Sequence, residues 1–252
     1  MGHGRAGIAA LALLVLLTPV PLAAGSYRLR AVEEDFTITT RSGERLRPVG
    51  VRFRLALDPD PSELRWRARV RRQLAYMLRA APFEIRPERP LRDRHGRLRV
   101  QLHAADGTWL QEIWVREGLA VVDPAGLAVP LRERLLAAEQ AARTAGVGIW
   151  REGLAGPVPA ASLQATHFRF VLVEGVARET GCGRVFCYLN FGVDRRRDFT
   201  LRVRRPVVRA WKRRGFALEA LVGRRLRLRG WIFAAGGPMM ELDDPASIEL
   251  LP

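Results

Sequence analysis

Apolar residues along the chain recur with strand-like and helix-like spacing in two separate blocks. The first block contains, in order, strand candidates within 35–54, a helix after Asp60-Pro61, strand candidates at 83–87 and 98–102, and helices at 110–118 and 130–145. Asp60 can cap the first helix, and Glu63 can complete a capping box. This block predicts a mainly β domain with packed helices, of the α+β class.

The second block has the order of an OB-fold, a small five-stranded barrel. Its candidates are strands at 168–177, 185–191 and 199–203, a helix at 207–214, and strands at 226–233 and 239–242. Gly, Pro and Ala dominate 153–163, which is typical of an interdomain linker. We therefore predict a first domain at 28–152 and a second, OB-fold-like domain at 164–252.

Residues 1–25 have the pattern of a secretory signal peptide. Arg5 precedes an unbroken apolar run from Ile8 to Leu17, and small residues follow at Ala23-Ala24-Gly25. An uncleaved membrane anchor is the alternative, but the apolar run is shorter than the roughly 20 residues that cross a bilayer. We expect an extracytoplasmic protein with no membrane span after cleavage.

The charge balance narrows the classes of partner. The chain has 42 Lys and Arg against 26 Asp and Glu, a formal net charge of +16. Such an excess predicts attraction to polyanions, either nucleic acid or an anionic membrane surface. A P-loop is excluded because the only lysine, Lys212, is followed by Arg213.

Cys182 and Cys187 lie five residues apart in a Gly-rich turn. In an oxidising compartment they can form a local disulfide. A zinc site needs more ligands than this turn offers.

Several motifs occur in the order found in one known family. They are Asp93-Arg-His-Gly-Arg97, the run from Ala105 to Ala120, Ala138-Glu-Gln-Ala-Ala-Arg143 and Gly148-Ile-Trp150. Together they make residues 30–152 resemble the staphylococcal nuclease family. The resemblance implies an OB-type barrel with packed helices, a bacterial periplasmic or secreted location, and calcium-dependent hydrolysis of nucleic-acid phosphodiesters.

The resemblance also implies roles for individual residues. Arg97 and Arg47 match the two arginines that stabilise charge on the attacked phosphate, and Asp35 matches a metal-binding aspartate. In the ungapped register, however, Arg52 stands where the family has its second metal-binding aspartate. Because a calcium ion needs several oxygen ligands, this arginine predicts weak metal binding.

A shifted register is the alternative. It would take Arg54 as the first arginine, Asp58 and Asp60 as metal ligands and Glu63 as the catalytic base. It requires a longer hairpin and breaks the Val-Gly-Val match, so we favour the ungapped register.

In the second domain, arginines alternate with leucines, which places Arg225, Arg227 and Arg229 on one face of a strand. OB-folds bind single strands through basic grooves with stacking aromatic residues, and Trp231 is available nearby. This face, with Trp231, is a candidate nucleic-acid site, but aromatic residues on strands belong more often to the core, and we favour the core for the aromatic residues.

The sequence thus predicts an exported nuclease homologue that binds nucleic acid or another polyanion, with weak or lost hydrolysis. One alternative is an active endonuclease that uses Ca²⁺, which requires Asp58, Asp60 or Glu63 to converge on Asp35. The other is a non-catalytic protein-interaction module.

Overall fold

The computed structural model describes residues 25–164, 168–194 and 196–252. The predicted signal peptide therefore lies, apart from Gly25, outside the described residues. Within the described residues, no helix is both long enough and apolar enough to cross a membrane.

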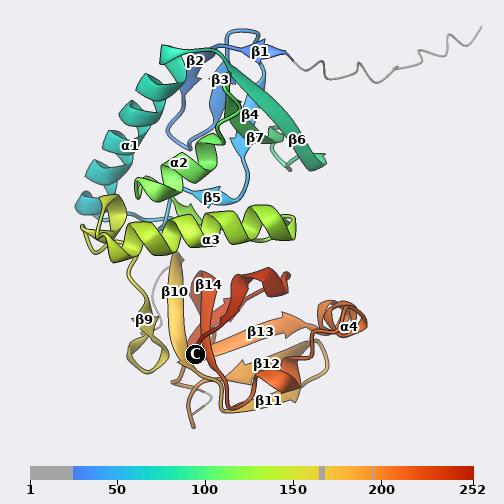
Figure 1. The fold of residues 1–252 in the computed structure, drawn as a ribbon. Helices are drawn as coiled ribbons and strands as arrows, with labels where there is room; N and C mark the ends of the chain where they lie inside the picture. The colour runs from blue at the N-terminus through green and yellow to red at the C-terminus, as the bar shows by residue number, and fades with distance from the viewer. Residues whose placement is uncertain (1–24, 165–167, 195) are drawn as a thin grey trace, which may run out of the picture.

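The first domain is built on a six-stranded sheet in the order β1-β6-β7-β4-β3-β2 (Figure 1). The strands are β1 Ser26–Tyr27, β2 Leu29–Val32, β3 Ile38–Thr40, β4 Arg45–Pro48, β6 Phe83–Arg92 and β7 Leu98–Ala104. β4 pairs with β7 in parallel, whereas β2, β3 and β4 form an antiparallel meander. A separate two-stranded sheet joins β5 Val51–Arg52 to β8 Val121–Val122.

The domain has three helices, α1 Pro61–Ala80, α2 Leu110–Arg116 and α3 Val129–Thr144. α1 packs against β2 and α2 against β7, whereas α3 packs against α2 and β8. Asp60 caps α1 as predicted, because its carboxylate accepts hydrogen bonds from the backbone N–H groups of Ser62 and Glu63. Trp66, Val70 and Leu74 form the buried stripe of α1. The first domain is therefore the predicted barrel with packed helices.

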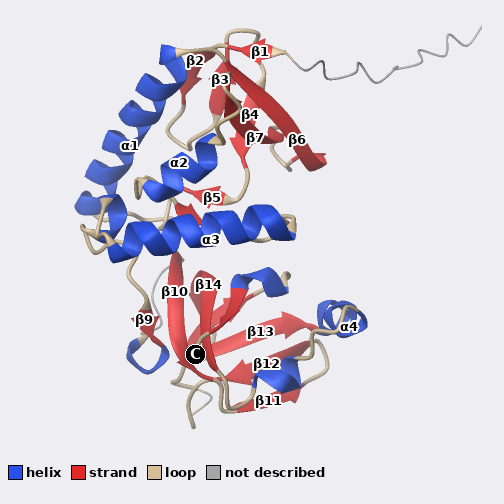
Figure 2. Ribbon diagram, viewed as in Figure 1, coloured by secondary structure: helices blue, strands red, loops and turns tan. Residues whose placement is uncertain are grey.

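The second domain contains mostly strands, as Figure 2 shows. Its elements are β9 Val158–Pro159, β10 Arg169–Val176, β11 Glu179–Cys182, β12 Phe186–Asn190, β13 Thr200–Arg204, α4 Arg205–Arg213, β14 Arg225–Ala234, β15 Pro238–Glu241 and β16 Ile248–Leu250. The sheet runs β11-β12-β13-β15-β14-β10-β9, with β16 on β14. Short 3-10 turns lie at Gly148–Trp150, Ala160–Ser162, Leu218–Leu221 and Pro245–Ser247.

Two features of the second domain differ from the expected pattern. The predicted linker is partly structured, because β9 pairs in parallel with β10. β11 was not expected as a strand, and it pairs with β12 next to a disulfide between Cys182 and Cys187. The disulfide itself agrees with the sequence-based interpretation.

The two domains share a buried boundary, with α3 lying between their sheets (Figure 1). Phe170 and Leu172 of β10 belong to the same apolar cluster as the first-domain core. The N–H group of Phe170 also donates to the carbonyl of Leu55, 2.5 Å away. The second domain therefore completes the first-domain core as well as forming its own.

A buried arginine links the domains across this boundary. Arg229 of β14 donates to the Glu139 carboxylate of α3 at 2.8 Å and to the Val122 carbonyl of β8 at 3.1 Å, and it also pairs with Glu249. Burial by itself would lower the pKa of Arg229, but the two carboxylates raise it above its usual value. Arg229 is thus a structural cation that binds the two domains together.

Candidate anion-binding site

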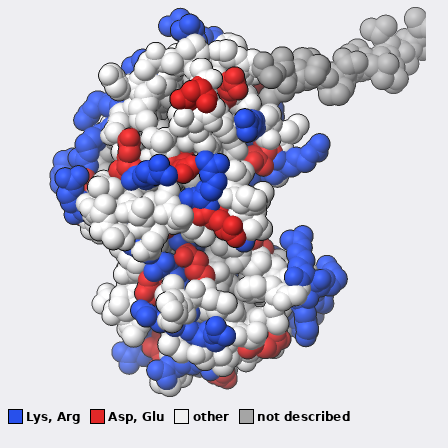
Figure 3. Space-filling view, viewed as in Figure 1, with Lys and Arg blue, Asp and Glu red and all other residues white. Residues whose placement is uncertain are grey.

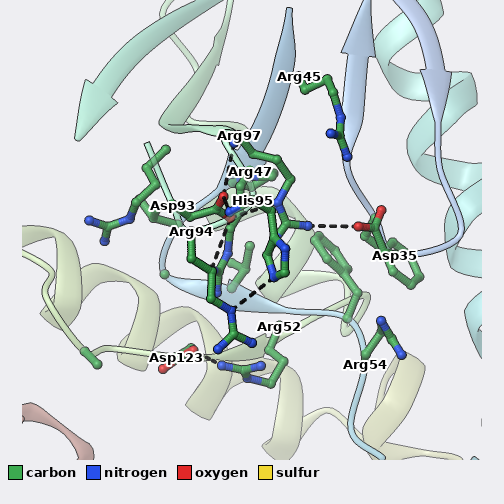
Figure 4. Close-up of a pocket in the computed structure, with 18 of the residues that line it drawn as sticks. Asp35, Arg45, Arg47, Arg52, Arg54, Asp93, Arg94, His95, Arg97 and Asp123 are labelled. Carbon is green, nitrogen blue, oxygen red and sulfur yellow. Dashed lines mark hydrogen bonds and ion pairs between the residues drawn. The ribbon is translucent and has the colours of Figure 1, made fainter. Parts of the chain in front are cut away.

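A pocket of about 1020 Å³ opens beside β4, β5 and the turn between β6 and β7. Eight arginines line it, Arg45, Arg47, Arg52, Arg54, Arg92, Arg94, Arg97 and Arg99. Three aspartates also line it, Asp35, Asp93 and Asp123, so the lining carries an excess of five positive charges. The surroundings of most of these side chains are drawn in Figure 4.

The turn that carries Arg97 is held by Asp93. The Asp93 carboxylate accepts hydrogen bonds from the backbone N–H groups of His95 and Arg97 and from Nε of Arg97, 2.8 Å away. Gly96 closes the turn with φ 74°, a conformation that glycine adopts without strain. Burial would raise the pKa of Asp93, but the hydrogen bonds and the charge of Arg97 lower it to about 2.

Arg97 also reaches across the pocket to Asp35. Its Nη1 donates to the Asp35 carboxylate at 2.9 Å and to the Thr37 hydroxyl at 3.1 Å (Figure 4). Burial works to raise the pKa of Asp35, yet its hydrogen bonds from Thr37 and the charges of Arg97 and Arg45 leave the pKa below the ordinary value. Asp35 is therefore an ionised carboxylate that already has a cationic partner.

Arg47 projects from β4 towards the same space. It lies 3.6 Å from Asp93, and 43% of its side chain is exposed. The pKa of Arg47 is lowered by burial and by the neighbouring charges of Arg52 and Arg97. The crowding of positive charge around Arg47 is therefore only partly relieved by carboxylates.

Arg52 occupies the boundary between the pocket and the second domain. It pairs with Asp123, and its guanidinium lies over the rings of Phe170 and Trp231, with centroids 4.6 and 5.2 Å away. Just before β5, Gly50 packs closely on Leu127, since a Cβ there would lie 2.8 Å from the Leu127 side chain. Nε of Arg52 is buried and has no hydrogen-bond partner among the described residues.

The remaining pocket arginines differ in how they are neutralised. Arg92 pairs with Glu44 at 2.9 Å. Arg45, Arg54, Arg94 and Arg99 make no ion pair with a described residue. Figure 4 shows Arg45 and Arg54 on opposite sides of Asp35. The pocket thus presents unpaired guanidinium groups on several sides, the arrangement that recognises phosphate or carboxylate.

The structure brings together three of the residues assigned by resemblance, Asp35, Arg47 and Arg97. It does not bring Asp58, Asp60 or Glu63 into the pocket lining. Asp58 is exposed and Asp60 caps α1. The shifted register therefore does not assemble a site.

Glu63 is a structural residue, which corrects its assignment as a catalytic base. It is 0% exposed, and its carboxylate accepts hydrogen bonds from the backbone N–H groups of Leu55 and Ala56, at 2.8 and 3.0 Å, and pairs with Arg67. It therefore closes the loop before α1 instead of completing a capping box.

The donor set around Asp35 does not fit a calcium ion. Calcium takes six to eight oxygen ligands, most of them carboxylates and carbonyls. Within the described residues, no group of three or more His, Cys, Asp and Glu side chains is placed to hold a metal. Arg52, at the position where the resemblance implied an acidic ligand, brings a positive charge to the pocket, and its carboxylate partner is Asp123.

The arginine face predicted in the second domain is largely neutralised. Arg229 is 1% exposed at the domain boundary, so it is not available to a nucleic acid. The Arg227 side chain is 12% exposed and pairs with Glu174 and Glu249. Arg225 is more exposed but lies 3.4 Å from Glu174. The glutamates come from neighbouring strands, so the alternation on one strand did not reveal them.

Trp231 packs against the core, as the core interpretation expected, although this core is that of the first domain. It meets Phe170 edge to face and also lines the arginine pocket.

Sequence reasoning missed Asp93 and Asp123 as pocket residues. Asp93 belongs to the turn motif and could have been found there, whereas Asp123 meets Arg52 only through the pairing of β5 with β8.

The fold and site define a protein with two β domains, the first of which is a helix-packed barrel with an arginine-lined pocket. A family model described as staphylococcal nuclease homologue matches residues 68–152. This part of the first domain therefore matches the staphylococcal nuclease homologue family. The matched segment includes Arg97 but begins after Asp35, Arg47 and Arg52. No curated protein matched the chain.

Proposed function

We propose that the protein binds the phosphate groups of nucleic acid in the arginine pocket without a metal ion, and that its hydrolysis is weak or lost. The observation that carries the proposal is that Arg47, Arg52 and Arg97 line one pocket. The resemblance implies an acidic metal ligand at the position of Arg52. Arg47 and Arg97 match positions that contact phosphate in the family. The pocket therefore keeps the phosphate-binding half of the family site.

The charges of the pocket support phosphate binding directly. Arg45 and Arg54 lack carboxylate partners among the described residues, and the buried Nε of Arg52 is a donor without an acceptor there. A bound phosphate oxygen would supply such an acceptor, and charge-assisted bonds to guanidinium groups are stronger than neutral ones. An anion in the pocket would also relieve the crowding of positive charge around Arg47.

The same residues argue against efficient hydrolysis. Attack on a phosphodiester needs an activated water molecule, and the family uses calcium and a glutamate for this step. Here Glu63 is buried away from the pocket, and Asp35 is paired with Arg97. The arginines can stabilise charge on the phosphate, but they do not generate the nucleophile.

An extracytoplasmic location fits this proposal. Residues 1–25 have the pattern of a signal peptide. Cys182 and Cys187 are disulfide-bonded, and disulfides persist in oxidising compartments such as the periplasm. The ligand is then nucleic acid met outside the cytoplasm.

The test measures binding and cleavage of single- and double-stranded DNA by the purified mature protein, with calcium or with chelator. We expect binding in both conditions and little cleavage in either. Arg47→Ala should weaken binding by about 10- to 100-fold, the range for loss of a charge-assisted hydrogen bond. Arg79→Ala, which removes an exposed charge at the end of α1, is the matched control.

Two outcomes would overturn the proposal. Calcium-dependent cleavage that Arg97→Ala abolishes would show an active nuclease. Absence of both binding and cleavage would favour a protein-interaction module. Circular dichroism of each variant separates loss of the site from loss of the fold.

A further inference from the structure

A second concentration of positive charge lies on α4, far along the chain from the arginine pocket. Five cationic residues, Arg205, Arg209, Lys212, Arg213 and Arg214, fall within the helix or directly after it, and all are exposed. Figure 3 shows a continuous area of Lys and Arg over the position of α4 in Figure 1. We refer to these five residues as the α4 surface.

The α4 surface has no internal neutralisation. None of its five residues makes an ion pair with a described residue. The neighbouring strand differs, since Arg202 and Arg204 of β13 both pair with Glu241. The α4 surface therefore keeps its whole charge available to an external anion.

Helix stability accounts for only part of these charges. Arg205 is the first residue of α4, where the helix dipole disfavours a cation, and the first turn has no acidic residue. Arg205 and Arg209, and Arg209 and Arg213, are like charges four residues apart, which repel each other. Lys212 and Arg213 in the last turn and Arg214 at the C-cap are placed favourably. Helix stability therefore does not explain the charges of Arg205 and Arg209.

The apolar face of α4 is already used. Val208 and Trp211 are buried in the second-domain core, and the Trp211 N–H donates to the Asp243 carbonyl at 3.2 Å. A helix that binds a membrane surface needs an exposed apolar face to enter the lipid. Charge without an exposed apolar face instead fits a hydrated phosphate backbone.

The position of α4 connects it to the pocket. The end of β6, which contributes Pro90 and Arg92 to the pocket lining, and α4 project on the same side of the molecule (Figure 1). In the space-filling view, Lys and Arg lie above and below the indentation between the two domains on that side (Figure 3). One extended polyanion can therefore follow both areas.

We propose that the α4 surface binds the phosphate backbone of a nucleic-acid strand whose adjoining segment occupies the arginine pocket. This inference rests on the proposed function for the identity of the polyanion. It adds a second, sequence-independent contact that a mononucleotide in the pocket cannot reach. It also makes binding depend on the length of the ligand.

The test compares two triple variants with equal loss of charge. Arg209→Gln/Lys212→Gln/Arg213→Gln alters the α4 surface, and Arg65→Gln/Arg72→Gln/Arg79→Gln alters exposed positions of α1. Fluorescence anisotropy measures the affinity for a long single-stranded oligonucleotide and, by competition, for a dinucleotide, over a series of salt concentrations. Circular dichroism checks folding.

We expect the α4 variant to lose affinity for the long oligonucleotide and to keep its affinity for the dinucleotide. Three lost phosphate contacts should reduce the slope of log affinity against log salt by about 2, since each contact on a single strand contributes about 0.7. The α1 variant should change the slope much less, although it removes the same charge.

The outcomes separate this inference from the proposed function. If the unaltered protein binds no oligonucleotide, the pocket proposal fails, and this inference fails with it. If it binds but the α4 and α1 variants give the same slope, only the α4 inference is overturned. Unchanged DNA binding combined with loss of binding to phosphatidylserine vesicles would assign the α4 surface to a membrane instead.

Discussion

The two sheets contain five strands in the same order, β2-β3-β4-β7-β6 in the first domain and β11-β12-β13-β15-β14 in the second. The arginines of the two domains nevertheless differ in how far carboxylates neutralise them. Both sheets place a meander beside a parallel pair, β4 with β7 in the first domain and β13 with β15 in the second. In the first domain, arginines outnumber the carboxylates around one pocket. On the second sheet, Glu174, Glu241 and Glu249 neutralise the arginines. The function of an arginine here depends on the carboxylates nearby, and the barrel itself does not specify it.

The largest predicted effect is the loss of stability when a neutralised, buried arginine is removed. Arg229→Met should lower the free energy of unfolding by about 3 kcal/mol, because Glu139 and Glu249 then lose their buried partner. Urea denaturation followed by tryptophan fluorescence measures the change.

Arg225→Met is the control on the same strand. Its side chain is 57% exposed, so its pair with Glu174 should contribute at most about 1 kcal/mol. Equal destabilisation by the two variants would contradict the structural role of Arg229.

A second prediction concerns the carboxylate that orders the pocket. Because the pKa of Asp93 is about 2 in the folded protein and near 3.8 in the unfolded chain, its charge stabilises the fold above about pH 4. This contribution, about 2 kcal/mol, should be lost as the pH falls from about 4 to 2.

Asp93→Asn should therefore lower the unfolding free energy at neutral pH and flatten its acid dependence. Denaturation curves across that pH range measure both effects. An unchanged acid profile in the variant would show that other carboxylates dominate acid unfolding.

An intermediate effect is expected for an unpaired pocket arginine. Arg54→Ala should weaken oligonucleotide binding by about 10-fold and leave stability nearly unchanged, because Arg54 has no ion-pair partner to lose among the described residues. Anisotropy titration and urea denaturation of the same sample separate the two quantities. A loss of stability without a loss of affinity would remove Arg54 from the site.

The smallest effect should come from the second sheet. Arg225→Ala should change oligonucleotide affinity by less than about twofold, because Glu174 already compensates its charge. The same titration measures it. A loss comparable to that of Arg54→Ala would restore the β14 face as a nucleic-acid site.

Local signals in the sequence predicted much of the fold. Asp60-Pro61 marks the start of α1, and apolar spacing indicates α2, α3 and most strands of both sheets. The turn from Asp93 to Arg97 was recognisable because its motif is contiguous. Such features depend on neighbouring residues, which the sequence displays directly.

Features that depend on distant residues were missed or misassigned. Glu63 could complete a capping box by spacing, but its carboxylate is used by the backbone of Leu55 and Ala56. Asp123 meets Arg52 from 71 positions further along the chain. No periodicity within one element records such a contact.

Local patterns in the sequence were enough to predict most of the elements and the basic charge, and the resemblance pointed to Arg52 as a departure from an acidic position. Which arginines lack an ion-pair partner can be seen only in the folded structure, because the carboxylates that pair with arginines come from other strands. Arg229 and Arg54 are the same residue type in strand-rich segments, yet one is buried between two glutamates and the other lines a pocket. Coulomb interactions act through space, so their partners are set by the fold and not by the order of residues.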